Sequence, residues 1–212
     1  MRLSGTPGQI LEQLQRDVPE IKEALKLSHG LVRHGKQEIY PYQAAALYLL
    51  AEQYDFFGGH ILEIGTYYGY SASILAQAAP MAFITTLNPN EREAEVARVA
   101  LLRFINVIVR QEHSWDYLEK STTTYDMIFV DGDHKRIARD LPWWNRLNAD
   151  GLFLFHDYTP LGSPRHCPPV YEILNQFRDW LEREFDVLVV DDQGVGMCGF
   201  YKLTGDPEFE AL

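Results

Sequence analysis

The feature that most constrains the fold of this chain is an alternation of short apolar segments with longer helical patterns. Strands are expected at 60–64, 82–87, 105–110, 126–131 and 151–156, and helices at 69–79, 90–103, 114–120, 134–147 and 168–184. Short apolar strands that alternate with helices are typical of a parallel sheet covered on both faces. The chain is therefore expected to form an α/β domain.

The end of the chain departs from this alternation. Two strand patterns, at 185–192 and 197–203, are separated by a short glycine-containing segment that is too short for a helix. Two strands joined in this way must pair as an antiparallel hairpin. With this hairpin, the sheet is expected to have seven strands and to be mostly parallel.

The start of the chain is expected to be helical. Patterns of apolar residues predict helices within 7–28 and 42–57, with a polar loop at 29–39 between them. Residues 1–57 are therefore expected to form an N-terminal lid or cap. Residues 58–204 are expected to form the core sheet and helices of a single domain.

Composition excludes several kinds of partner. The formal net charge of −11 argues against nucleic acid, because neutralising phosphates requires clusters of lysine and arginine. The chain contains no apolar run of about eighteen residues, so no membrane helix is expected. The N-terminus lacks the layout of a signal peptide, and Cys167 and Cys198 have no metal or redox spacing. A cytoplasmic protein is the expectation.

A glycine turn joins the first core strand to the helix that follows it, in the segment ILEIGTYYGYSAS (61–73). A dinucleotide-binding turn has a glycine where this chain has Tyr67, and that glycine lets the backbone approach a pyrophosphate. Its absence argues against NAD. Glu63 lies within the apolar strand, where a carboxylate is costly without a partner, so it favours a ligand that is cationic or carries an amino group. The alternative is a tight turn in which Glu63 caps nearby backbone amides.

Acidic and histidine residues follow two predicted strands at the points where they end. Asp131, Asp133 and His134 follow the strand at 126–131, and His156 and Asp157 end the strand at 151–156. Ligands of open α/β sheets bind at this edge. Such a group of charges indicates a metal ion, a proton-transfer site or a structural network. The alternative for Asp133 is that it caps the following helix.

These motifs together resemble a known family. The segments LEIGTYYGYSASILA and DGDHK…HDY, with the terminal hairpin, resemble the class I S-adenosylmethionine-dependent methyltransferases, in particular the catechol O-methyltransferase-like enzymes and the family-24 methyltransferase domains. The resemblance implies a Rossmann-like methyltransferase fold and S-adenosyl-L-methionine as cofactor. It places one group of residues at the methionine end of the cofactor: Glu63, Gly65, Tyr67, Gly69 and Ser71.

The resemblance assigns further cofactor contacts less directly. The family has an acidic residue for the ribose at the end of the second strand, where this chain has Thr86, with Asn88 the nearest group of similar reach. The alternative for the segment 88–90 is a turn with Asn90 as a helix N-cap. Ser114 and Trp115 fall at positions that contact adenine in the family. Asp131 completes the expected set of cofactor-binding residues.

The resemblance also implies a metal site and a catalytic base. Asp131 and Asp157 match two ligands of a divalent ion, and Tyr158 stands where the family has an amide as the third ligand. A tyrosine is a poor magnesium ligand, so His156 or Asp133 can substitute, and histidine shifts the preference from magnesium toward manganese, iron or zinc. His134 matches the catalytic lysine and is the expected base, with Asp131 beside it.

The resulting hypothesis is methyl transfer from S-adenosylmethionine to a hydroxyl oxygen of a small molecule. Two alternatives stay open: a scaffold that binds the cofactor without turnover, and a nucleotide-dependent oxidoreductase. A homo-oligomer is a further option. Selectivity for the acceptor is expected in two loops, 28–37 with His29, Arg33 and His34, and 159–169 with Arg165 and His166.

Overall fold

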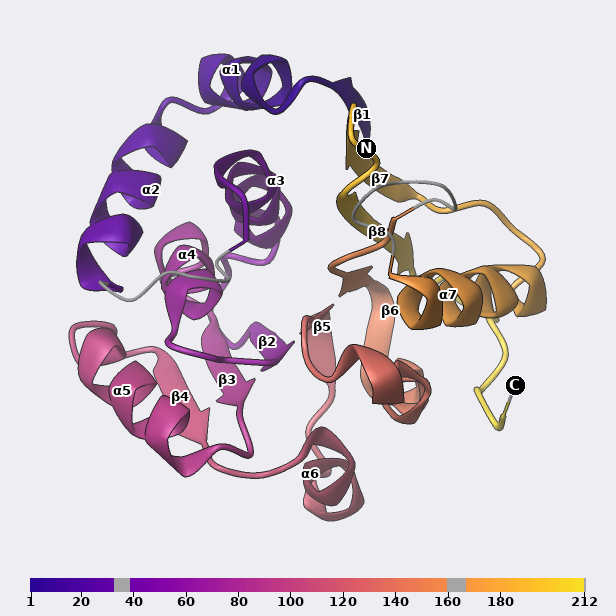
Figure 1. The fold of residues 1–212 in the computed structure, drawn as a ribbon. Helices are drawn as coiled ribbons and strands as arrows, with labels where there is room; N and C mark the ends of the chain where they lie inside the picture. Colours follow the sequence, from indigo (N-terminus) through magenta and orange to yellow (C-terminus); the bar gives the residue numbers. More distant parts are fainter. Residues whose placement is uncertain (33–38, 160–166, 212) are drawn as a thin grey trace.

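A computed structural model describes residues 1–32, 39–159 and 167–211 and contains one eight-stranded sheet (Figure 1). The strand order is β1-β7-β8-β6-β5-β2-β3-β4, and only β8 runs antiparallel to its neighbours. The strands are β1 (Arg2–Gly5), β2 (His60–Ile64), β3 (Phe83–Leu87), β4 (Val107–Arg110), β5 (Tyr125–Val130), β6 (Leu147–Phe155), β7 (Val187–Asp191) and β8 (Gly196–Tyr201). The mostly parallel sheet and its C-terminal hairpin are confirmed.

Helices cover both faces of this sheet. They are α1 (Pro7–Asp17), α2 (Glu20–Leu31), α3 (Pro41–Glu52), α4 (Tyr70–Ala78), α5 (Glu91–Leu101), α6 (Ser114–Lys120) and α7 (Pro168–Trp180), with the 3-10 helices η1 (His134–Arg139) and η2 (Leu141–Arg146). In Figure 1, α1 to α5 lie on one side of the sheet, and α6, α7 and the 3-10 segments lie on the other. The domain is therefore a three-layer α/β sandwich.

The core consists of two apolar layers, one on each face of the central strands. Ile61 and Met127 face the layer formed with α3 and α4, whereas Leu62 and Ile128 face the layer that contains Trp143 and Trp144. All of these side chains are fully buried. Burial of one such side chain contributes about 1.5–3 kcal/mol. Because both layers are apolar, β2, β5 and β6 read as continuous hydrophobic runs in the sequence.

The strand count is one higher than predicted. The additional strand, β1, pairs in parallel with β7 at the edge of the sheet, with Arg2 opposite Leu188. The Arg2 guanidinium donates to the carbonyl of Phe185. The prediction missed β1 because its four residues, Arg-Leu-Ser-Gly, carry no apolar run, and pairing with β7 rather than local propensity makes it a strand.

The helix predicted at 134–147 is wrong. The chain instead forms η1 and η2, and Arg136 within η1 has φ −120°, which is not helical. Asp140, at the junction, is buried and accepts a hydrogen bond from the Ser114 hydroxyl. Burial raises the pKa of Asp140 to about 6, although Ser114 lowers it. Pro142, at the start of η2, has no backbone N–H to donate, so one regular helix cannot run through η1 and η2.

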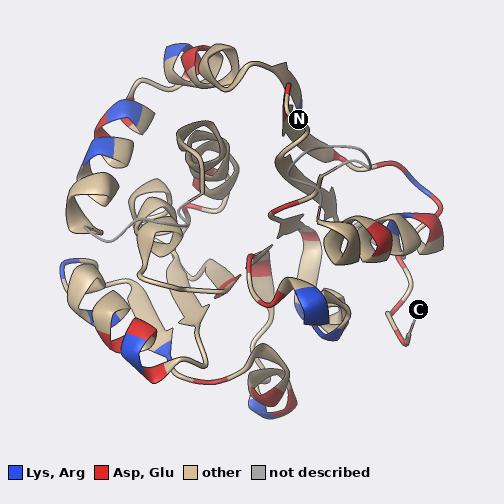
Figure 2. Cartoon of the chain, viewed as in Figure 1, with Lys and Arg blue, Asp and Glu red and all other residues tan. Residues whose placement is uncertain are grey.

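The charged side chains show no extended basic face in the part of the chain that is described. Figure 2 shows acidic and basic residues interspersed on α2 and α5, with a basic group on η1 that includes Lys135, Arg136 and Arg139. No helix among the described residues has the length and apolar character needed to cross a membrane.

Candidate active site

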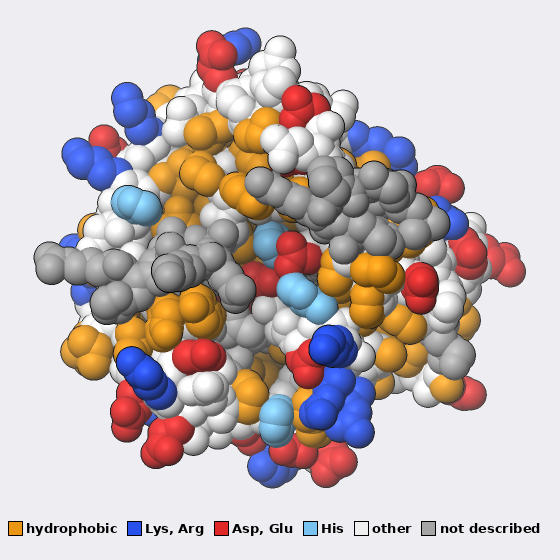
Figure 3. Space-filling model, viewed as in Figure 1, with side chains coloured by type: hydrophobic (Ala, Val, Ile, Leu, Met, Phe, Trp, Pro, Cys, Tyr) orange, Lys and Arg blue, Asp and Glu red, His pale blue; other side chains and the backbone are white. Residues whose placement is uncertain are grey.

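A cavity of about 920 Å³ opens at the carboxyl edge of the sheet, where β2, β3, β5 and β6 end. Its volume is within the range of about 300–1,000 Å³ that is usual for ligand pockets. One end is lined by the glycine turn after β2 and by the start of α4, and the other by the residues that follow β5 and β6. Figure 3 shows this face, with acidic and histidine side chains close together near its middle.

The glycine turn is shaped by contacts within the protein. A side chain at Gly65 would place its Cβ 2.1 Å from the carbonyl oxygen of Asp131, and Gly65 has φ +107°. A side chain at Gly69, which has φ +91°, would place its Cβ 3.0 Å from Leu101 Cδ1 on α5, closer than ordinary van der Waals contact. Tyr67 lies between them in the left-handed region, with φ 46°, and lines the cavity with Gly65. The turn therefore brings its backbone to the cavity while Gly69 packs against a helix.

Glu63 lies beneath the cavity rather than in it. Its side chain is fully buried, Oε2 accepts a hydrogen bond from the Thr86 hydroxyl, and Oε1 has no hydrogen-bond partner among the described residues. Burial raises the pKa of Glu63 to about 7, and the hydroxyls of Ser71 and Thr86 lower it. Ser71 lines the cavity. Glu63 is thus in reach of a ligand only through Ser71.

The residues at and just after the end of β3, where the family has its ribose-binding acid, differ in their surroundings. The Thr86 hydroxyl is used by Glu63 and Thr66 and is fully buried. Asn88 lines the cavity, but its oxygen accepts from the amide of Asn90 and its Nδ2 donates to Glu93 Oε2 at 3.0 Å. Glu93 also lines the cavity. A carboxylate therefore lines this part of the cavity from α5 and is hydrogen-bonded to Asn88, although no site residue was predicted there.

Helix caps account for part of this region. Asn90 accepts from the amide of Glu93 at 3.2 Å, as predicted for an N-cap. Asp133 accepts from the amide of Lys135 at 3.1 Å and caps η1. Asp133 also lines the cavity, but its carboxylate is not among the group that converges at the ends of β5 and β6.

Ser114 and Trp115 are not among the described residues that line the cavity. The Ser114 hydroxyl donates to Asp140. The Trp115 ring stacks on His113 at a centroid distance of 4.3 Å, with the Arg139 guanidinium 4.7 Å from its centre on a cation–π contact. Their predicted contact with adenine stays a prediction.

Four ionisable side chains converge at the ends of β5 and β6, as predicted. His156 Nδ1 lies 3.1 Å from Asp131 Oδ1 and 3.2 Å from Asp157 Oδ2. His134 Nε2 lies 3.0 Å from Asp157 Oδ2 and 3.8 Å from Asp131 Oδ1. Asp157 has φ 55°, a left-handed conformation that costs an aspartate about 1–3 kcal/mol and recurs at functional sites.

The charges in this cluster shift one another's pKa. Burial opposes ionisation of Asp131 and of Asp157, but His156 and His134 outweigh it and hold both carboxyl pKa values below their usual range. Contacts with Asp131 and Asp157 raise the pKa of His134 to about 10. Without a cation on the carboxylates, His134 is therefore an imidazolium at neutral pH. A cation that neutralised the carboxylates would remove the cause of this shift.

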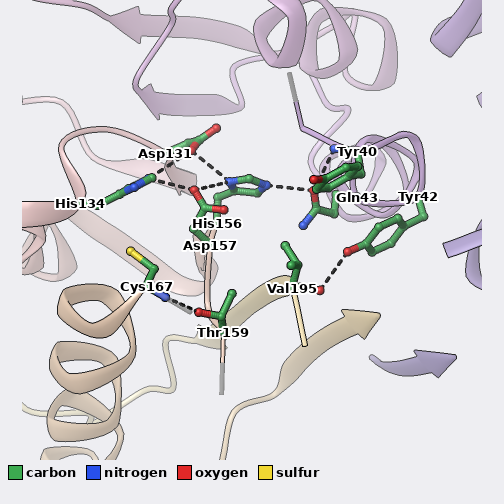
Figure 4. A network of polar contacts seen from close by, with 10 residues as sticks. All are labelled: Tyr40, Tyr42, Gln43, Asp131, His134, His156, Asp157, Thr159, Cys167 and Val195. Carbon is green, nitrogen blue, oxygen red and sulfur yellow. Dashed lines mark hydrogen bonds and ion pairs between the residues drawn. The ribbon is translucent and has the colours of Figure 1, made fainter. Parts of the chain in front are cut away.

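An amide that was not predicted, Gln43 on the first turn of α3, lies beside this cluster. Its Oε1 lies 3.0 Å from His156 Nε2, on the side of the ring opposite the two carboxylates (Figure 4). Tyr158, at the position of the amide ligand in the family, is turned away, because its hydroxyl faces Asn175 and its ring packs on Phe185. The prediction of Tyr158 as a poor ligand is consistent with this orientation.

Three side chains fit the donor set of a divalent cation. One ligand atom each from Asp131, His156 and Asp157 lies within 4.8 Å of the others. Two carboxylates with one imidazole suit manganese, iron, cobalt or zinc better than magnesium. The residues present therefore fit a metal ion, with His156 in place of the amide.

The predicted selectivity loops are described only in part. His29 lines the cavity, but it belongs to α2, which extends to Leu31, so the first loop starts later than predicted. Arg33, His34, Arg165 and His166 lie outside the described residues. Their predicted contacts with an acceptor stay predictions.

Comparison with known proteins supports the resemblance. Residues 62–158, a little under half of the chain, match a family model described as a methyltransferase domain, of methyltransferase family 24. This match spans the glycine turn, Asp131, His134 and Asp157. No curated protein matches the chain in sequence.

Solved methyltransferase structures share the fold over most of the chain. Cofactor-bound Rv0187 from MTB is 21% identical, with 87% of this chain and 90% of that chain covered and a TM-score of 0.66. The O-methyltransferase TomG from Streptomyces achromogenes, in complex with SAM, is 21% identical (86% and 89% covered, TM-score 0.63). An O-methyltransferase from Bacillus cereus, in complex with SAH, is 20% identical (90% and 96% covered, TM-score 0.64).

At these identities the structural likeness establishes the fold, whose strand order and hairpin agree with the resemblance seen in the sequence. Residues 62–158 match a methyltransferase domain, and the chain shares its fold with solved O-methyltransferase structures over most of its length.

Proposed function

We propose that this protein transfers a methyl group from S-adenosylmethionine to a hydroxyl oxygen of a small molecule. The observation that carries the proposal is a single cavity with two chemically different ends. One end is a glycine turn with hydroxyl and amide groups, and the other is a cluster of two aspartates and two histidines. A methyltransferase needs both, because the cofactor and the acceptor must meet in line.

The turn end suits the cofactor. The N-terminus of α4 lies at this end of the cavity, which Tyr70 and Ser71 line, and the positive end of the helix dipole favours a carboxylate such as that of the methionine moiety. Glu63, behind Ser71, favours the cationic amino and sulfonium groups. Glu93, oriented by Asn88, can accept hydrogen bonds from the two ribose hydroxyls. S-adenosylmethionine, when bound, supplies the methyl group on its sulfonium.

The cluster end suits the acceptor. A divalent cation on Asp131 and Asp157 would lower the pKa of an acceptor hydroxyl as a Lewis acid. His134 Nε2 lies 3.0 Å from Asp157 Oδ2 and donates to this carboxylate, which leaves Nδ1 of the neutral ring to take the hydroxyl proton and Asp157 to stabilise the imidazolium. Its side chain is 38% exposed, so the proton can pass on to solvent. Asp131 and Asp157 thus position both the acceptor and the base.

A small molecule is the acceptor that this geometry supports. The cluster lies inside the cavity rather than on an open surface, with Asp131 19% and Asp157 28% exposed. The net charge of −11 disfavours nucleic acid. The named O-methyltransferases among the similar structures support oxygen as the accepting atom. The cytoplasm and a possible homo-oligomer stay predictions.

Two alternatives have some support. A scaffold without turnover is favoured by Thr86, which cannot replace the ribose-binding acid. A nucleotide-dependent oxidoreductase is favoured by the general architecture alone. Glu93 weakens the first alternative, and Tyr67 in the glycine turn weakens the second.

Calorimetric titration separates the three functions. S-adenosylmethionine and S-adenosylhomocysteine are expected to bind with micromolar affinity and NAD not at all. Tight NAD binding would favour the oxidoreductase. Failure of both sulfur compounds to bind below millimolar concentration would refute methyl transfer. Binding without any turnover on a panel of hydroxylated acceptors, with and without divalent cations, would favour the scaffold.

A further inference from the structure

The orientation of the Gln43 amide is fixed independently of the active site. Its Oε1 accepts from the backbone N–H of Tyr40 at 2.8 Å, as part of the cap of α3. If the amide were flipped, its NH₂ group would face the N–H of Tyr40, and two donors would oppose each other. The atom that faces His156 Nε2 at 3.0 Å is therefore an oxygen, which can only accept.

The fixed oxygen determines the tautomer of His156. Because Gln43 Oε1 can only accept, Nε2 of His156 carries the hydrogen and donates it. In the neutral ring, Nδ1 then has a lone pair, and this lone pair faces the carboxylates of Asp131 and Asp157 (Figure 4). The repulsion between this lone pair and the two anionic oxygens is relieved either by a proton on Nδ1 or by a metal cation bound between the three groups.

Nδ1 is also a buried atom without a hydrogen bond. The His156 side chain is 9% exposed, and Nδ1 forms no hydrogen bond of acceptable geometry to any described residue, although two oxygens lie within 3.2 Å. Both oxygens therefore flank the direction of the lone pair instead of lying on it. A metal ion at about 2.0–2.2 Å from each ligand has neighbouring ligand atoms about 3 Å apart, which is the spacing seen here.

We propose that His156 Nδ1 completes a cation site with Asp131 and Asp157, and that this site selects a transition ion over Mg²⁺. We further infer that Gln43 is a positioning residue that keeps His156 in the tautomer the site requires. Imidazole nitrogen favours Co²⁺ and Zn²⁺, then Mn²⁺, whereas Mg²⁺ prefers oxygen ligands and water. The inference rests on the proposed function, in which Asp131 and Asp157 hold a cation, and adds its third ligand and its selectivity.

Titration of the full chain with Co²⁺ tests the site without cofactor or acceptor. After removal of metals by a chelator, one Co²⁺ per chain is expected to bind with a visible absorption band, and a hundredfold excess of Mg²⁺ is expected not to displace it. His156→Asn should weaken Co²⁺ binding at least tenfold and change the band, while His113→Asn, whose imidazole stacks on Trp115 and does not line the cavity, should leave both unchanged. Absence of Co²⁺ binding, displacement by Mg²⁺, or an unchanged His156→Asn variant would overturn the proposal.

A second set of variants tests Gln43. Gln43→Leu should weaken Co²⁺ binding about 10–100-fold, as expected for a partner of a metal-bound histidine, and Gln43→Glu, which still accepts from Nε2, should keep the affinity. Gln77→Leu is the control, because Gln77 donates to Ser28 and to the carbonyls of Ala24 and Ser73, far from the cluster in the fold. It should cost stability and leave Co²⁺ binding unchanged.

Nitrogen-15 NMR of the Zn²⁺ form reads the tautomer directly, and it does so even if Gln43→Leu does not fold. Nε2 of His156 should carry a proton and Nδ1 should be the ligated nitrogen. A ligated Nε2, or a folded Gln43→Leu variant that binds Co²⁺ as the wild type does, would refute the role of Gln43. Because these readouts need no S-adenosylmethionine, a protein that binds Co²⁺ but no sulfur compound would refute the proposed function alone.

Discussion

The two ends of the cavity are built in opposite ways. At the glycine turn, most polar side chains pair with one another: Thr86 donates to Glu63, and Asn88 donates to Glu93. At the ends of β5 and β6, two carboxylates and two imidazoles lie 3.0–3.8 Å apart, His156 Nδ1 has no hydrogen bond to a described residue, and Asp157 has the strained φ of 55°. The first end thus consists mainly of paired polar groups, whereas the second concentrates charge.

The difference indicates how the work of the enzyme is divided. A surface whose polar groups are already paired recognises a ligand by its shape and by a few oriented groups. Such a surface suits the binding of a cofactor rather than a change in its charge. Unsatisfied charge and backbone strain gather where chemistry occurs. Variants of the turn should therefore affect folding and cofactor affinity, and variants of the cluster should affect turnover.

The largest effect is expected from His134→Ala. Removal of the base should lower kcat by about 10²- to 10⁴-fold, because general base catalysis contributes that much, while affinity for S-adenosylmethionine changes little. Turnover would be measured with labelled cofactor and dihydroxybenzene acceptors. Lys135→Ala, on the exposed side of the same 3-10 helix, is the matched control. Unchanged kcat in His134→Ala would remove this residue as the base.

Gly65→Ala should be the most damaging change at the turn. The new Cβ would lie 2.1 Å from the carbonyl oxygen of Asp131 at a φ of +107°, so overpacking and backbone strain together should cost about 3 kcal/mol or more of unfolding free energy. Gly58→Ala separates the two causes, because Gly58 has φ +85° but no atom within 4 Å of the added Cβ. Equal losses in denaturant unfolding would show that the contact with Asp131 is unimportant.

Glu63 should give the turn a pH dependence. Its pKa is raised by burial from 4.5 to about 7, so the folded state binds the proton more tightly than the unfolded chain. The stability contributed by this group is present below about pH 4.5 and is lost as pH rises through 7, by up to about 3 kcal/mol. In Glu63→Gln this part of the pH dependence should vanish in denaturant unfolding. A wild-type curve that runs parallel to that of the variant between pH 5 and 8 would contradict the shift.

Glu93→Gln should have the smallest effect of the four. The loss of one charge-assisted acceptor for the ribose hydroxyls should weaken S-adenosylhomocysteine binding about tenfold, and kcat should stay near the wild-type value. Glu95→Gln, which is exposed on the same helix, is the control. If calorimetry shows the same affinity for Glu93→Gln and the wild type, the ribose is held by another group.

The elements that form the sheet were predictable because their signal is local. The strand predicted at 60–64 and the helix predicted at 114–120 have the same bounds in the structure, and the glycine turn and the two strand ends follow from them. The short strand β1 was missed because pairing with a distant strand forms it. The helix at 134–147 was wrong because Pro142, which cannot donate a hydrogen bond within a helix, lies inside it, and periodicity alone does not register this residue.

The site was predictable only where its residues follow strands. Asp131, His134, His156 and Asp157 lie at strand ends, and a parallel sheet brings such ends together. Gln43 contacts His156 from 113 residues away, and its position at a helix start gives no sign of this role. Glu93 was not among the predicted site residues, although a carboxylate shortly after the second strand was a signal that could have been followed.

The most direct test of this division of roles is a crystal structure of the protein with S-adenosylhomocysteine and Mn²⁺, with anomalous diffraction used to locate the ion. The account predicts S-adenosylhomocysteine over Gly65, with its ribose at Glu93, and a single anomalous peak between Asp131, Asp157 and His156 Nδ1. S-adenosylhomocysteine bound elsewhere, or a cavity that stays empty with saturating cofactor, would contradict the account.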